Sequence, residues 1–249
     1  AYKNNLKYGV YDQFGIHKDT LKDLIMFKTS QSDDYITFKE YLDRKPESQK
    51  AIYYATGRSK QSIMNLPQMD VMKENGSEVL LFTDEIDEFM IQILNSYEEV
   101  PFKSVQQGEV DFVDDSKKED IKSKEKENKD ILKAIKKSLK DKVKDVKLTA
   151  RLKDSPVCIV SGEGLSLEME KILKSMPNQQ EVKAEKILEI NPDHDLFKAI
   201  QSVYEKDSSK INEYASLLYH QALLIEGLPI EDPTEFSTNL VKLMIESSK

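Results

Sequence analysis

Residues 50–57 read "KAIYYATG" and residues 77–84 read "SEVLLFTD". The first stretch is an apolar run that ends at Gly57, which is typical of a buried strand followed by a turn. Between the two, "PQMDVMKENG" places Pro67 in the first turn of a short helix and Gly76 at its end. The second stretch is a similar strand, and "EIDEFMIQILNSY" after it predicts another helix. The order strand, helix, strand, helix predicts a parallel pair with crossover packing, and so a small βαβ-type α/β unit.

Beyond this unit the composition changes abruptly, because residues 114–147 are dominated by charged side chains. Within them, apolar residues recur at steps of 3, 4, 4 and 3, at Leu132, Ile135, Leu139, Val143 and Val146. This spacing predicts one apolar stripe on a helix that docks on a domain. Residues 114–130 are compatible with either a helix or a hinge. We therefore place a domain boundary near residue 113 and expect domains at residues 1–113 and 114–249.

The second domain alternates again between strand and helix patterns. "VKLTARL", "SPVCIV" and "EKILEIN" predict three strands, and Asn191-Pro192 predicts the start of a helix. Two further helices are expected, from Asp207 to Ile225 and from Pro233 to the end of the chain, separated by "GLP". The overall prediction is a mixed α/β (α+β) fold.

The stretch "VCIVSGEGLSLEMEKILKSM" at residues 157–176 raises the question of a phosphate-binding loop, because a strand, two glycines and a helix follow one another. Leu167 occupies the position of the third glycine of the dinucleotide pattern, and Glu163 places a carboxylate in the loop. No Lys-Ser or Lys-Thr pair follows. A nucleotide-dependent enzyme therefore remains an alternative that lacks a complete motif, and the amphipathic helix is the clearer signal.

Net charge, cysteine and histidine content and the length of apolar runs exclude several functional classes. The 249 residues carry a net charge of -8, which argues against a nucleic-acid partner. The single cysteine, Cys158, cannot form an internal disulfide, so we expect a reducing, cytoplasmic compartment and a buried thiol. The three histidines lack metal-ligand spacing, and no apolar run approaches the ~20 residues that span a bilayer. We expect no catalytic residue, no metal site, no membrane partner and no signal peptide.

Five segments together resemble, in order and spacing, the second half of the ninety-kilodalton heat-shock chaperones of bacterial type. These segments are "FKEYLDRKPESQKAIYYATGRS", "GSEVLLFTDEIDEFMIQIL", "VKDVKLTARLKDSPVCIV", "LEINPDHDLF" and "YHQALLIEGLPIEDPTEF". The resemblance implies that residues 1–113 are the C-terminal part of a middle domain and residues 114–249 a C-terminal dimerisation domain. It also implies that the ATP and Mg²⁺ sites of the parent protein lie outside this chain, so that the chain has no cofactor and is not an enzyme by itself.

By the same resemblance, the chain forms a homodimer in which the last two helices of each copy build a four-helix bundle. The residues expected at this interface are Tyr214, Leu217, Leu218, Leu224, Ile225, Phe236, Leu240, Leu243 and Met244. Unfolded or partly folded client proteins are the other partners that the resemblance implies. The expected client-binding residues are Leu165, Met169, Ile172, Leu173, Met176, Glu88, Phe89 and Gln92. Two alternatives stay open: the stripe from Leu165 to Met176 packs inside its domain, or the chain is an inert dimerisation scaffold.

Overall fold

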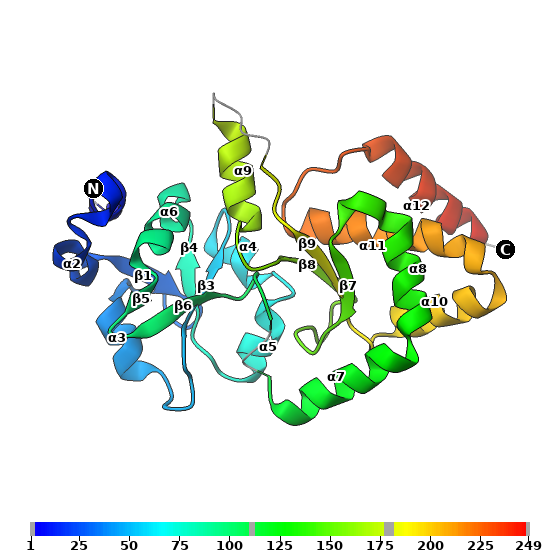
Figure 1. Ribbon diagram of the computed structural model, residues 1–249, viewed down its shortest axis with the longest axis horizontal. Helices are drawn as coiled ribbons and strands as arrows, with labels where there is room; N and C mark the ends of the chain where they lie inside the picture. The colour runs from blue at the N-terminus through cyan, green and yellow to red at the C-terminus, as the bar shows by residue number, and fades with distance from the viewer. Residues whose placement is uncertain (1–2, 110–112, 177–181, 248–249) are drawn as a thin grey trace. The chain divides into compact units, whose positions relative to one another are not determined.

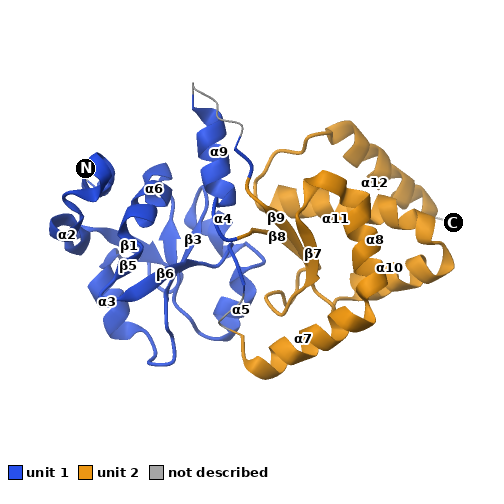
Figure 2. Cartoon of the chain, in the orientation of Figure 1, with its two compact units in different colours: residues 1–112, 163–183 blue, residues 113–162, 184–249 orange. Residues whose placement is uncertain are grey.

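The computed structural model describes residues 3–109, 113–176 and 182–247. The chain divides into two compact units (Figure 2). The first contains residues 1–112 and 163–183, and the second contains residues 113–162 and 184–249. Both units combine helices with a sheet, which confirms the mixed α/β (α+β) prediction. Contacts place residues 163–183 with the first unit, although the sequence pattern groups them with the second.

A six-stranded sheet in the order β2-β1-β4-β3-β6-β5 forms the centre of the first unit (Figure 1). Its strands are β1 (Met26–Thr29), β2 (Ile36–Thr37), β3 (Ile52–Thr56), β4 (Leu80–Phe82), β5 (Ser96–Tyr97) and β6 (Val100–Ser104). Strands β3 and β4 are parallel, with Tyr54 opposite Leu80, as the strand–helix–strand pattern predicts. Strand β6 adds a second parallel neighbour to β3, and β1 pairs antiparallel with β4.

Short helices surround this sheet. They are α1 (Lys3–Tyr11), α2 (Lys18–Leu21), α3 (Phe38–Arg44), α4 (Lys60–Met64), α5 (Met69–Glu74), α6 (Glu85–Leu94) and α9 (Leu167–Ser175), with 3₁₀ turns η1 (Asp12–Gly15) and η2 (Lys22–Leu24). Local capping explains several boundaries. Thr37 Oγ1 accepts a hydrogen bond from the Glu40 amide, and the Thr37 amide donates one to the Glu40 carboxylate. Helix α1 packs on α6, and α9 packs on α6 as well.

The core of the first unit is rich in aromatic rings. Phe27 lies 4.8 Å from Phe82 between ring centroids, and Tyr54 stacks on Phe82 at 4.6 Å. Phe38 extends the cluster from α3 and contacts Phe27 at 5.3 Å. Offset and edge contacts of this kind add to the gain from burying apolar area, so the sheet and α3 form one packed body on which α6 and α9 are mounted.

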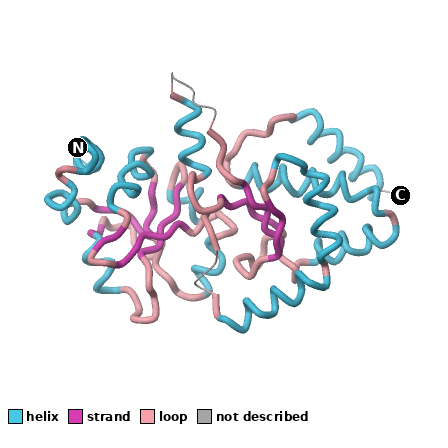
Figure 3. Tube along the Cα trace, in the orientation of Figure 1, coloured by secondary structure: helices cyan, strands magenta, loops and turns pink. Residues whose placement is uncertain are grey.

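The second unit is built on a three-stranded sheet in the order β7-β9-β8, drawn as magenta strands in Figure 3. The strands are β7 (Asp145–Leu148), β8 (Val157–Ser161) and β9 (Lys186–Ile190). The helices are α7 (Asp115–Glu127), α8 (Lys129–Leu139), α10 (Asp195–Lys206), α11 (Ile211–Ile225) and α12 (Pro233–Ser247), with 3₁₀ turns η3 (Lys140–Lys142) and η4 (Ser208–Lys210). Strand β7 ends at Leu148, four residues earlier than the "VKLTARL" pattern predicts, although Thr149 and Arg151 remain buried.

The charge-rich segment is helical rather than a hinge. Asp114 caps α7 by accepting a hydrogen bond from the Lys117 amide, and none of the described residues of α7 is buried. Helix α8 buries Ile131, Leu132 and Ile135 and packs against α11, which also contacts β8. Leu132, Ile135 and Leu139 therefore dock as predicted, but the helix ends at Leu139. Val143 follows the 3₁₀ turn η3 and Val146 lies in β7, so the last part of the predicted stripe is not helical. Within the described part of the chain, no helix combines the length and apolar character needed to cross a membrane.

Candidate functional site

Helix α6 presents two different faces. Asp87 accepts a hydrogen bond from the Asp84 amide at 3.1 Å, which fixes the start of the helix. On the inner face, Glu88 is only 1% exposed. On the outer face, Gln92 is exposed, and Phe89 is half-buried with its ring edge-to-face against Tyr11 at 5.3 Å. Phe89 and Gln92 are therefore accessible to another molecule, whereas Glu88 is not.

Two hydroxyl groups bind the buried Glu88 carboxylate. Thr56 Oγ1, at the end of β3, donates to Glu88 Oε1 at 2.7 Å. Ser166 Oγ donates to Glu88 Oε2 at 2.8 Å. Burial raises the pKa of Glu88, and the two hydrogen bonds oppose this shift.

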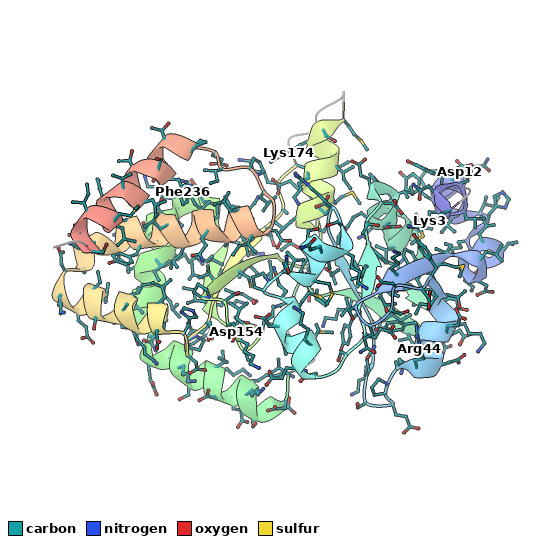
Figure 4. All side chains as sticks on the ribbon, turned by 180° about the vertical axis from the view of Figure 1, so that it is seen from behind. Lys3, Asp12, Arg44, Asp154, Lys174 and Phe236 are labelled. Atoms are coloured by element: carbon teal, nitrogen blue, oxygen red, sulfur yellow. The ribbon has the colours of Figure 1, made fainter. Side chains whose placement is uncertain are left out.

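Ser166 immediately precedes α9 and caps it, because its hydroxyl oxygen accepts a hydrogen bond from the Met169 amide at 2.9 Å. In the preceding turn, Gln107 Nε2 donates to the Gly164 carbonyl at 2.9 Å. The start of α9 is thus fastened to the first unit at two points. Lys174 stands near the other end of the helix and projects from it (Figure 4).

The apolar stripe of α9 is split between inward and outward positions. Met169 and Ile172 are buried, at 8% and 4% exposure. Leu165 and Leu173 are half-buried, and Met176, just after the helix, is 40% exposed. The outward part of the stripe is therefore Leu165, Leu173 and Met176, on the same unit as Phe89 and Gln92.

A second apolar surface lies on α12. This helix has 15 residues, and none of them is buried. Its large exposed side chains are Leu240 at 40%, Val241 at 50%, Met244 at 63% and Ile245 at 52%. Leu224 and Ile225, at the end of α11, are 53% and 38% exposed. Isolated exposed apolar residues are ordinary, but a contiguous set on one helix marks an interaction surface.

The opposite face of α12 rests on α11. Phe236 lies between the two helices, with its ring 5.6 Å from that of His220 (Figure 4). Ser216 Oγ donates to Glu235 Oε1 at 3.0 Å near the start of α12, and Lys210 pairs with Glu246 at 3.1 Å near its end. The two helices therefore run antiparallel, with α12 held by polar contacts along one side.

The residues expected at the dimer interface fall into three groups by exposure. Leu218 is buried within its own chain, and four others are half-buried. The half-buried residues are Tyr214, Leu217, Phe236 and Leu243. Leu224, Ile225, Leu240 and Met244 are exposed. Val241 and Ile245 were not anticipated; each directly follows an expected residue, and together they widen the stripe into a broad apolar face.

The loop before α9 does not fit a nucleotide phosphate. The Ser166 side chain already occupies the cap, and Glu168 and Glu170 lie in the first turn of the helix. The Glu88 carboxylate adds a further acidic group, and carboxylates repel a phosphate at this position. Among the described residues, no group of three or more His, Cys, Asp or Glu side chains could hold a metal ion.

Comparison with known proteins shows what this chain is similar to. The family model described as "Hsp90 protein" matches residues 1–249. The chain is 49% identical over 244 residues to the chaperone protein HtpG of Clostridium botulinum (strain Langeland). It is 47% identical over 245 residues to the chaperone protein HtpG of Bacillus subtilis (strain 168). Each match covers 98% of this chain but 39% of the relative, so the chain spans well under half the length of these proteins. A family model that covers every residue, with relatives nearly half identical in sequence, shows that the chain belongs to the Hsp90 family.

Proposed function

We propose that this chain provides the homodimerisation surface and part of the client-binding surface of an ATP-dependent, cytoplasmic molecular chaperone. In this proposal residues 1–113 are the C-terminal part of a middle domain and residues 114–249 a C-terminal dimerisation domain. The relatives are named chaperone proteins, and the chain covers 39% of their length. ATP and Mg²⁺ would act in the parent protein outside this chain, and the chain alone would not hydrolyse ATP.

The observation that carries the dimerisation proposal is that α12 buries none of its residues in its own chain. Each apolar side chain fully removed from water contributes about 1.5–3 kcal/mol. Leu240, Met244 and Ile245 would gain this only against a partner, and a second copy supplies the same face. A two-fold pairing of α11 and α12 produces a four-helix bundle, in which both copies cover each other.

The client-binding proposal depends on outward side chains of α6 and α9, two helices that pack against each other. Phe89 and Gln92 from α6 and Leu173 and Met176 from α9 are accessible on the same unit. Methionine is flexible and polarisable, so it adapts to partners of different shape. Such a surface suits partly folded chains, which expose apolar groups without a fixed geometry.

Suppression of aggregation tests this surface. We expect Leu173→Ser with Met176→Ser to reduce suppression of the aggregation of a heat-denatured enzyme roughly by half or more, because both side chains supply apolar area. The matched control is Leu24→Ser with Met26→Ser, which removes the same two kinds of side chain from exposed positions elsewhere on the first unit, 55% and 40% exposed. Equal suppression by both variants and the wild type would favour the alternative, an inert dimerisation scaffold without affinity for unfolded clients.

A further inference from the structure

Three side chains from distant parts of the sequence meet beneath the start of α9. Thr56 ends β3, Glu88 belongs to α6, and Ser166 precedes α9. All three are buried, at 7%, 1% and 8% exposure. The Ser166 and Glu88 positions are 78 residues apart in sequence, so this contact forms only when α9 docks on α6.

Hydroxyl donors, rather than a cation, hold the Glu88 carboxylate. In the described part of the chain, one hydroxyl reaches each carboxylate oxygen, and no lysine or arginine pairs with Glu88. The neighbouring acidic groups Glu168 and Asp87 raise the pKa of Glu88 further, after the larger effect of burial. A buried charged acceptor that loses a donor bears a large desolvation penalty, so the Ser166 hydroxyl is important to the docked state of α9.

Ser166 uses its hydroxyl twice. The oxygen accepts from the Met169 amide and thereby starts the helix, while the hydrogen is donated to Glu88 Oε2. The same side chain therefore sets both where α9 begins and where it is attached. With α9 in this position, Met169 and Ile172 are buried, whereas Leu173 and Met176 are partly exposed.

We propose that Glu88 is a positioning residue. Its buried carboxylate holds α9 through the hydrogen bond from Ser166, a contact called the clasp below, and so determines which apolar residues of α9 a client meets. With the clasp formed, Leu173 and Met176 are accessible to a client. When the clasp breaks and α9 detaches, Met169 and Ile172 become accessible as well. This inference rests on the proposed client-binding function. It assigns to Glu88 a role different from direct contact with a client, which its 1% exposure does not permit.

Replacing Ser166 by Asp or by Asn, two side chains of nearly the same shape, distinguishes the effect of the clasp from that of the helix cap. Asp and Asn cap a helix about as well as Ser. Ser166→Asp places a second carboxylate against Glu88, whereas Ser166→Asn offers an amide that can donate to it. We expect hydrogen–deuterium exchange of the residue 167–175 amides in the full chain to be roughly ten- to a hundredfold faster in Ser166→Asp than in Ser166→Asn.

A double variant tests whether the effect acts through Glu88. Glu88→Gln combined with Ser166→Asp restores a donor–acceptor pair, so exchange should return close to that of Ser166→Asn. Equal exchange rates in Ser166→Asp and Ser166→Asn, or no recovery in the double variant, would contradict the proposal that Glu88 holds α9. Exchange is measured without a client. The exchange rates could therefore change as expected while every variant suppresses aggregation equally well. This result would support the clasp and contradict the proposed client-binding function.

Discussion

Lys7 Nζ lies 2.8 Å from Asp84 Oδ2, and the Lys7 side chain is completely buried. The same ammonium pairs with the fully buried Asp87 and lies 4.5 Å from the centre of the Phe27 ring. Helix α1 is thereby joined to the start of α6, the helix that carries Glu88, Phe89 and Gln92. This charge cluster holds the position of α6.

Removing the ammonium leaves the buried Asp87 carboxylate without the cation it pairs with, whereas Asp84 keeps its pair with Lys3 at 2.8 Å. We expect Lys7→Met to lower the free energy of unfolding of the first unit by about 3–5 kcal/mol. The control Lys39→Met breaks the exposed pair with Asp43 and should cost ~0.5 kcal/mol or less. Urea denaturation of both variants measures the difference, and similar midpoints would show that the cluster does not hold α6.

The Tyr41 hydroxyl connects three parts of the first unit. It donates to the Glu78 carbonyl at 2.6 Å and accepts from Gln49 Nε2 at 2.9 Å and from the Tyr53 amide at 3.2 Å. Tyr41→Phe keeps the ring and removes the hydroxyl, so we expect a loss of about 1–3 kcal/mol in the free energy of unfolding. The exposed Tyr35→Phe is the control. A Tyr41→Phe variant as stable as this control would contradict the role of the hydroxyl.

We expect His220, which packs against Phe236 between α11 and α12, to make this contact sensitive to pH. Burial lowers its pKa, the nearby Lys142 lowers it further, and Glu235 and Asp232 oppose the shift. A base with a lowered folded pKa stabilises the fold above its unfolded value of about 6.5, and this contribution is lost as pH falls through the folded pKa. The free energy of unfolding of the second unit should therefore decrease below about pH 6.5, by at most ~1.4 kcal/mol per pH unit.

His220→Gln removes this titration. Thermal unfolding of wild type and variant at about pH 7.5 and about pH 5.5 should show the smaller acid-induced loss in the variant. Carboxylates titrate in both proteins, so their contribution cancels in the comparison. Equal losses in the two proteins would mean that His220 does not couple pH to the packing of α12.

Much of the fold follows from local sequence patterns. The apolar runs that end at Gly57 and after Phe82, with a helix between them, predict the parallel β3–β4 pair that the structure contains. The last helix was also predictable, because Asp232 and Pro233 are local start signals. Periodicity carries this information because it repeats within a few residues.

The burial of single groups could not be predicted in the same way. The pattern of α6 does not reveal that Glu88 points inward, because its partners Thr56 and Ser166 lie 32 and 78 residues away. The stripe of α9 likewise did not show that Met169 is buried while Met176 is exposed. Such properties depend on tertiary contacts, which one sequence does not encode locally.

Sedimentation velocity of a charge variant tests the central claim most directly. Met244 is 63% exposed in the single chain, so we expect Met244→Glu to leave the fold of that chain intact. Phe14→Glu, at a residue 97% exposed on the first unit, is the matched control.

At micromolar concentration we expect wild type and Phe14→Glu to sediment with twice the 28.7 kDa mass of the chain, and Met244→Glu to sediment as a monomer. A wild-type protein that is monomeric there, or a Met244→Glu variant that remains as dimeric as the control, would contradict the claim that a second copy covers α12.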